Sequence, residues 1–360
     1  MFDYIRNWFQ QRFSDPNAVT LTILLVIGFS IILIWGSILT PFLVAIVFAY
    51  LLEGPTALLQ RLGVGRTIAA SFVFLTFIMV MLLLMIFLVP VVWEQSFNLM
   101  RELPKIAQAW DQLMVQAQEF APAFIEPQQV LAFSENITAR LLSFGESILA
   151  QSLSSLVNAF TLLIYLVIVP LLVFFMLKDK DVLLGHFNRI LPKQRRMISQ
   201  VGIEMNTQIR NYIRGKALEI MIVGVVTYVV FALFDLRYAA LLATLVGFSV
   251  LIPYIGAAVV TVPVALVGLF QFGVAPTLFW LIFAYLVIQA LDGNVLVPLL
   301  FSEAVSLHPI YIIGAVLVFG AIWGFWGVFF AIPLASLVKA VIMAFSQQRR
   351  LQEHAEGAEP

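Results

Sequence analysis

Long apolar segments limit the folds that this sequence can adopt, and Val19–Trp35 and Ile68–Val89 are two examples. A helix needs about 20 consecutive apolar residues to cross the ~30 Å hydrocarbon core of a bilayer. Of the 360 residues, 62% are apolar and 11% are charged, whereas a soluble domain is roughly half apolar and a quarter charged. The alternating pattern of a transmembrane β-barrel is absent. The sequence therefore predicts an all-α fold, a polytopic transmembrane helical bundle.

About eight membrane spans are predicted, preceded by a short amphipathic segment. Apolar residues recur at helical spacing between Phe2 and Phe13, which predicts an interfacial helix lying on the membrane before the first span. The first apolar run lacks the small-residue cleavage site of a signal peptide, so we interpret it as a retained span. The spans are expected near residues 19–37, 39–53, 67–92, 156–177, 217–234, 239–269, 274–291 and 308–345.

Two of these segments, 239–269 and 308–345, are too long for one straight crossing. The first would measure about 46 Å as a continuous helix, against ~30 Å of hydrocarbon. Broken or re-entrant helices are therefore predicted near 250–258 and 318–333. Paired interruptions of this kind indicate a binding site in secondary transporters, although Gly and Pro also occur in ordinary transmembrane helix packing. The predicted site residues at the first break are Pro253, Tyr254 and Gly256, and the breakers of the second are Gly324, Gly327 and Pro333.

The charges between spans predict the orientation of the protein. Residues 178–216 contain nine basic and three acidic residues, whereas residues 94–155 contain three basic and seven acidic residues. Because Lys and Arg are retained on the cytoplasmic side, the first segment is expected inside and the second outside. We therefore expect a multi-pass membrane protein with both termini in the cytoplasm.

The outward-facing segment, residues 94–155, is predicted to be helical. Its apolar residues recur at alternating steps of four and three, as in the seam of a coiled coil. The partner of this stripe is either residues 137–148 of the same segment or a neighbouring subunit of a homo-oligomer. The stripe consists of Leu99, Leu103, Ile106, Trp110, Leu113, Ala117 and Phe120.

A basic helix over residues 187–214 is predicted on the cytoplasmic side. One face is apolar, so we expect it to lie on the inner leaflet and to bind anionic lipid, at about 1 kcal/mol per basic residue.

The predicted organisation is an interfacial helix with spans one to three, the outward helical segment, a transport core that contains the basic helix, and a disordered tail. These occupy residues 1–93, 94–155, 156–346 and 347–360.

The sequence LVIQALDGNVLVPLL places polar residues and helix breakers inside an apolar run. An ionised aspartate in lipid costs several kcal/mol, so Asp292 is expected to face protein or a wet cavity. The helix should end near Gly293 and leave carbonyls free for a cation or polar solute. The alternative is that Asp292 marks the membrane edge and points into water. The predicted binding residues are Asp292, Asn294 and Gln289, with Gly293 and Pro298 as helix breaks.

Glu219 is a further candidate binding residue because it follows the basic segment within an apolar run. Lys216 and Arg214 lie within about a turn and a half of it on a helix. The alternative is therefore that one of them simply pairs with the carboxylate.

Several classes of function receive no support. The chain has no cysteine and its three histidines are scattered, so no metal site is predicted. There is no P-loop, nucleophile elbow or HExxH motif, and we expect neither an enzyme nor a bound cofactor. Basic and acidic residues balance at 20 each, which gives no indication of nucleic-acid binding.

Four stretches of the sequence resemble the autoinducer-2 exporter (AI-2E) family of bacterial membrane proteins. They are FFMLKD (174–179), NYIRGKAL (211–218), LIPYIG (251–256) and the long run from LVPLL to LVKAV (296–341). The resemblance implies an eight-span inner-membrane transporter of small polar solutes, with signal-molecule exporters and sodium or lithium/proton antiporters among its relatives, and with oligomeric members. Asp292, Asn294 and Pro298 match its polar stretch, and Pro253, Tyr254 and Gly256 match its break, whereas Glu219 lies outside its pattern.

The function expected from these observations is a secondary permease or exporter of a small polar solute, cation or signal molecule. The breaks near Pro253 and Gly293 would frame the site, and Asp292 would couple flux to a proton or sodium gradient. The alternatives are a non-transporting oligomeric scaffold of the cell envelope and a passive oligomeric channel.

Overall fold

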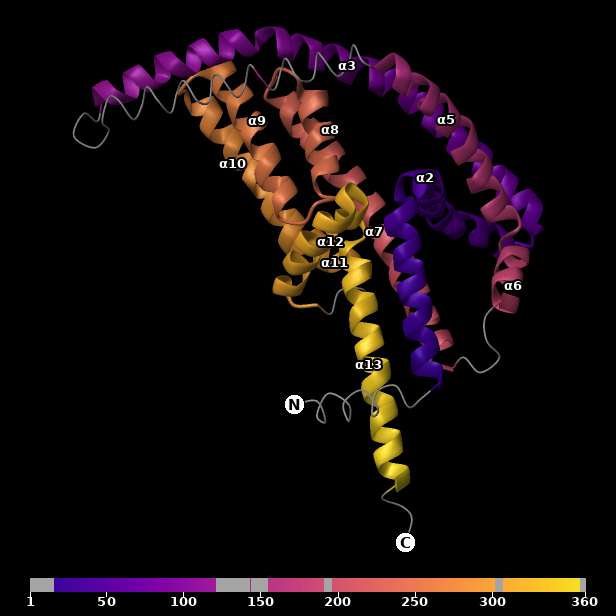
Figure 1. Cartoon of the computed structure of the whole chain (residues 1–360). Helices are drawn as coiled ribbons and strands as arrows, with labels where there is room; N and C mark the ends of the chain where they lie inside the picture. Colours follow the sequence, from indigo (N-terminus) through magenta and orange to yellow (C-terminus); the bar gives the residue numbers. More distant parts are fainter. Residues whose placement is uncertain (1–15, 121–142, 144–154, 191–195, 302–306, 357–360) are drawn as a thin grey trace.

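The computed structural model describes most of the chain, and all of its regular elements in the described residues are helices (Figure 1). The predicted interfacial helix near the N-terminus and the predicted partner stretch 137–148 lie largely outside the described residues. The residues that the structure describes are 16–120, 143, 155–190, 196–301 and 307–356.

The helices differ widely in length, from five residues to 55. In chain order they are α2 (Pro16–Arg61), α3 (Arg66–Phe120), α5 (Ser155–Lys178), α6 (Lys180–Ile190), α7 (Arg196–Leu233), α8 (Ala239–Ser249), α9 (Ile255–Phe272), α10 (Pro276–Leu291), the π-helix η1 (Asp292–Leu296), α11 (Val297–Phe301), α12 (Pro309–Phe329) and α13 (Ala331–Glu356).

The prediction of a polytopic helical membrane protein is confirmed. Within the described residues, seven helical stretches are long and apolar enough to cross a bilayer, and three shorter apolar stretches accompany them. The predicted spans at 19–37 and 39–53 form one helix, α2, with a kink at Trp35. At the other end of the chain, α13 continues past residue 346 to Glu356.

Three long helices lie side by side at one end of the molecule, and an arch covers the other end. The N-terminal halves of α2 and α7 pack with α13 around Leu21, Val201 and Ala340. The start of α2 and the end of α13 lie at the same end (Figure 1). At the opposite end α3 curves over α8, α9 and α10, and α5 runs beside its first half (Figure 1).

The second half of α3 is fixed to the turn between α7 and α8 and to the start of α8. The Leu241 N–H donates to Gln95 Oε1 at 2.9 Å, and the Tyr238 hydroxyl donates to Glu102 Oε2 at 2.7 Å. Burial and the Glu102 carboxylate raise the pKa of Tyr238 to about 12, so this donor keeps its proton at neutral pH. Leu99, the first residue of the predicted stripe, packs against the apolar core of α7 and α8. This part of the stripe therefore contacts its own chain.

The apolar face of the predicted basic helix does not lie on lipid. Ile198, Val201 and Met205 pack against residues of α2 and α13, and Val201 is buried. The same face continues to Tyr212, which is buried against α12. An apolar stripe indicates that a helix face is covered, but it cannot distinguish lipid from protein. Protein therefore covers the apolar face of this helix, and the binding of anionic lipid by its basic residues stays a prediction.

Both predicted helix breaks are present, and each is built on a glycine beside a backbone carbonyl. Between α8 and α9 the chain turns at Tyr254, with φ 63°, and a Cβ on Gly256 would lie 1.8 Å from the Ser249 carbonyl oxygen. In α12 the backbone leaves helical geometry at Gly324, with φ 59°. A Cβ on Gly327 would lie 1.8 Å from the Phe319 carbonyl oxygen. Both long predicted segments are therefore interrupted where a glycine packs against a backbone carbonyl.

Replacing Gly256 with alanine should destabilise the protein strongly. The added Cβ would meet the Ser249 backbone, which cannot move away as a flexible side chain can, and we expect a loss of about 3 kcal/mol or more. Thermal unfolding in detergent would measure it. Gly314→Ala is the matched control, because nothing lies within 4 Å of the Cβ position there. Equal unfolding temperatures for both variants would contradict this account of the break.

Candidate functional site

A lysine and a glutamate form a buried ion pair on α7. Lys216 Nζ lies 2.7 Å from Glu219 Oε2, and the two side chains are only 7% and 2% exposed. Residues three apart share one helix face, which places both groups at the same interface. Charges inside a membrane protein occur mainly in pairs and at functional positions. The pairing considered from the sequence is thus formed, and it is formed by Lys216.

The lysine also joins the pair to the first helix break. Its Nζ donates to the Val250 carbonyl at 2.8 Å, at the residue that follows the last turn of α8. The ammonium group also lies 5.3 Å from the centre of the Phe301 ring, a cation–π distance. Gly215 leaves room for this ring, because a Cβ there would lie 2.5 Å from a ring carbon. Lys216 therefore connects α7, the break and α11.

The second break is attached to α7 one turn earlier. The Tyr212 hydroxyl donates to the Phe329 carbonyl at 2.7 Å, and Phe329 is the last residue of α12. Tyr212 and Lys216 are four residues apart and share a helix face. Both broken helices therefore end on one side of α7. The sequence reasoning missed this role of Tyr212 and Lys216, although both lie within the motif NYIRGKAL.

Asp292 lies near the ion pair, at the start of the π-helix. It interacts electrostatically with both Lys216 and Glu219, and η1 contacts α7. The side chain is half-buried, and its buried Oδ1 has no hydrogen-bond partner among the described residues. Three ionisable groups from α7 and η1 thus gather beside the first break, a set we call the charged cluster (Lys216, Glu219 and Asp292).

The sequence predicts that the helix ends near Gly293. In the structure it continues there as a wider π turn. The Val297 N–H donates to the Asp292 carbonyl, five residues back, and the helix then continues as α11. Backbone groups surrounded by lipid must be satisfied within the segment, and a π turn keeps them bonded where a true end would not. Single π turns occur often at functional sites.

The other predicted binding residues lie at different positions around the cluster. Gln289 is half-buried, one turn before Asp292. Asn294 is exposed and donates to the Ala290 carbonyl of its own helix at 2.8 Å. Tyr254 is 59% exposed, and the break contributes the Val250 carbonyl to the cluster. The structure therefore brings Glu219 and Asp292 together and leaves Asn294 and Tyr254 apart from them.

The remaining predicted positions belong to the framework of the site. Gly256 is buried at the first break, with Pro253 half-buried beside it, and Pro298 is exposed in α11. Gly324 and Gly327 form the second break, and Pro333 is buried early in α13.

Polar groups continue from the charged cluster along the interface between α7 and α10. Thr227 lies about two turns beyond Glu219 on α7, roughly 12 Å further along the helix, and its side chain is fully buried. On α10, Gln289 lies between Asp292 and Tyr285. The Tyr285 hydroxyl is 3.1 Å from the Thr261 hydroxyl on α9, and the Tyr285 ring contacts Phe231 of α7. We call Glu219, Asp292, Gln289, Tyr285 and Thr227 the polar track.

Several polar atoms in the track have no hydrogen-bond partner within the described part of the chain. Glu219 Oε2 is ion-paired, and Gln289 interacts with the Tyr285 hydroxyl, but neither Glu219 Oε2 nor Gln289 Nε2 has a hydrogen bond of good geometry. Thr227 Oγ1 and Asp292 Oδ1 are also unsatisfied. Most buried polar groups in proteins are hydrogen-bonded, and each exception costs about 1–3 kcal/mol. Water, a cation or a polar solute would satisfy them. No group of three His, Cys, Asp or Glu side chains suited to a metal ion occurs in the described residues.

The chain is similar to known transport proteins over nearly its whole length. A profile described as "AI-2E family transporter" matches residues 21–347. The protein named "Putative permease PerM" from Escherichia coli (strain K12) is 51% identical over 354 residues, covering 98% of this chain and all of the relative. The "AI-2 transport protein TqsA" of the same organism is 25% identical over 334 residues, covering 89% of this chain and 92% of the relative.

These matches cover the spans, both helix breaks and the charged cluster. They agree with the apolar helices in making the chain a multi-pass membrane protein of a family of transporters. The resemblance expected from the sequence motifs is confirmed: the chain belongs to the AI-2E transporter family.

Proposed function

We propose that this protein is a secondary permease that moves a small polar solute or cation along the polar track between α7 and α10. The observation that carries the proposal is the row of unsatisfied polar atoms beside a buried ion pair. Such atoms are costly in a dry apolar interior, and a transported polar species or its water would bond to them. The first helix break lies beside the cluster and the second broken helix contacts α7 one turn away, and paired breaks of this kind are typical of transporter binding sites.

Asp292 is the group that couples flux to a gradient in this proposal. Its Oδ1 has no hydrogen-bond partner in the described part of the chain, so it is available to a proton or sodium ion. Lys216 and Glu219 interact with it, so a change in the charge of Asp292 alters the balance of the whole cluster. Lys216 holds the Val250 carbonyl at the break, which gives the cluster a direct connection to backbone that can move.

The cellular setting forms part of the same proposal. The basic segment 178–216 and the acidic segment 94–155 support an inner-membrane protein with cytoplasmic termini. The name of the relative TqsA refers to AI-2 transport, which makes a small polar signal molecule one candidate cargo. We also propose a homo-oligomer, because the predicted apolar stripe extends along α3 beyond the turn that it contacts.

Flux measurements on the purified protein in liposomes test the proposal. Vesicles with a pH-sensitive dye inside are given a sodium gradient, a proton gradient or neither, and parallel vesicles are screened for uptake of labelled polar solutes. A permease produces flux that follows an imposed gradient. Solute flux that is the same with and without gradients would identify a passive channel. A complete lack of flux across the screen would favour a scaffold.

A further inference from the structure

A cavity of about 240 Å³ lies at the C-terminal end of α2, where α6 and α7 meet it. Four of its lining side chains are cationic, and they come from three different helices: Arg61, Lys180, Arg210 and Arg214. Since a molecule of liquid water occupies about 30 Å³, the cavity has room for a small polyatomic anion.

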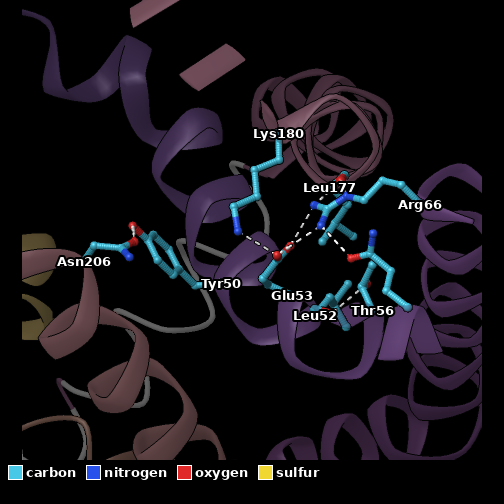
Figure 2. A network of polar contacts seen from close by, with 9 residues as sticks. Tyr50, Leu52, Glu53, Thr56, Arg66, Leu177, Lys180 and Asn206 are labelled. Carbon is cyan, nitrogen blue, oxygen red and sulfur yellow. Dashed lines mark hydrogen bonds and ion pairs between the residues drawn. The ribbon is translucent and has the colours of Figure 1, made fainter. Parts of the chain in front are cut away.

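The one acidic group in the lining is already paired. Glu53 Oε2 accepts from Arg66 at 2.9 Å, and Glu53 Oε1 accepts from Lys180 at 2.6 Å. Figure 2 shows the two cations approaching this carboxylate from opposite sides, Arg66 from α3 and Lys180 from α6. Arg66 also donates to the Leu177 carbonyl at the end of α5. Glu53 thus holds the helix ends together and has little capacity left for other cations.

The three arginines of the cavity have no partner in the part of the chain that the structure describes. In the described residues, the guanidinium groups of Arg61, Arg210 and Arg214 form no ion pair or hydrogen bond. The lining contains four cationic side chains and one carboxylate, which leaves an excess of three positive charges. This carboxylate is also paired with Arg66, which lies outside the lining.

Arg214 is held in place by the packing of α2 against α7. The Arg214 guanidinium lies against the α2 backbone at Gly54, where a Cβ would be only 2.6 Å from Nη2. Close by, the Tyr50 hydroxyl donates to Asn206 Oδ1 at 2.9 Å, which fixes the same two helices (Figure 2). The packing of α2 against α7 therefore brings Arg214 to the cavity beside the half-buried Arg210 and the exposed Arg61.

We propose that this cavity binds a phosphate group. Planar guanidinium groups form paired hydrogen bonds with phosphate oxygens, and three unpaired cations are enough to neutralise its one or two negative charges. The cavity lies between the C-terminal end of α2 and the middle of α7, and basic pockets between membrane-spanning helices can bind anionic lipid headgroups. A soluble phosphate offers the same chemistry. The bound group would join α2, α6 and α7, and Arg214 lies only two residues before Lys216 of the charged cluster.

The test compares anion binding by the wild type, Arg210→Gln/Arg214→Gln and a matched control, all as full-length protein in detergent. The control, Arg101→Gln/Lys105→Gln, removes two exposed charges from α3. Phosphatidylglycerol is titrated and bound lipid is counted by native mass spectrometry. Each charge removed from the cavity should weaken binding roughly five-fold, whereas the control should bind as the wild type does. If the first variant does not fold, Arg61→Gln/Arg210→Gln replaces it.

A second arm distinguishes the two sources of the phosphate group. Inorganic phosphate is added to delipidated protein at constant ionic strength, and the unfolding temperature is followed. The site is assigned to soluble phosphate by two results together. Phosphate raises the unfolding temperature of the wild type and the control but not of the cavity variant, and all three proteins bind phosphatidylglycerol equally. If the cavity variant matches the control for both the lipid and inorganic phosphate, the proposal is wrong.

Discussion

Replacing Asp292 with asparagine is expected to abolish gradient-coupled flux while leaving the protein folded. The substitution keeps the size of the side chain and removes its charge and its ability to exchange a proton. Asp292 Oδ1 has no hydrogen-bond partner among the described residues, so little stabilisation is lost with the charge. We expect the free energy of unfolding to change by less than about 1 kcal/mol. The measurement is flux in liposomes under an imposed proton or sodium gradient.

The control for this variant is Asp235→Asn. This control makes the same aspartate-to-asparagine change at an exposed position in the turn after α7. The φ angle there is 50°, a left-handed conformation that asparagine adopts readily. Its flux should equal that of the wild type. If Asp292→Asn also keeps full coupled flux, Asp292 has no part in coupling, and the site must be sought elsewhere along α7 and α10.

Replacing Lys216 with methionine is expected to destabilise the protein by about 3–5 kcal/mol. The change leaves Glu219 buried without its counter-ion, and the uncompensated charge is the costly product of breaking such a pair. It also removes the donor to the Val250 carbonyl and the cation beside Phe301. Chemical or thermal unfolding in detergent measures the loss. Lys105→Met, at an exposed position on α3, should unfold as the wild type does.

A double variant separates the structural role of the pair from its role in transport. Lys216→Met/Glu219→Met replaces the pair with apolar side chains of similar length, an exchange that is often neutral or stabilising. We expect it to recover most of the lost stability but none of the flux. A double variant that transports normally would reduce the pair to a structural feature. A stable Lys216→Met single variant would contradict the burial that the structure gives to Glu219.

The elements that could be predicted from the sequence are those fixed by local rules. Apolar runs become helices because lipid offers the backbone no other hydrogen-bond partners. Tyr254, Gly256 and Gly324 lie at breaks because their local sequence interrupts helices that are too long for one crossing. The breaks near 250–258 and 318–333 were therefore accessible from residue type and segment length alone.

The features that the sequence did not reveal depend on contacts between distant residues. Lys216 bonds to a carbonyl 34 residues away and Tyr212 to one 117 residues away, and no spacing rule within a helix contains such information. In the sequence, the π turn that begins at Asp292 could not be distinguished from a helix end, because Gly293 is compatible with either structure. The face around Val201 is covered by protein where lipid was expected, since both select apolar residues.

The central claim is that the polar track is wet inside the membrane-embedded protein. The chain has no cysteine, so single cysteines can be introduced without a background. We would place them at Thr227 and Gln289 in the track, at Leu281 in the apolar core and at exposed Leu62. Labelling in liposomes with a small hydrophilic thiol reagent should modify positions 62, 227 and 289 but not 281. If 227 and 289 stay as unreactive as 281 while 62 is labelled, the track is dry and the proposed transport path is contradicted.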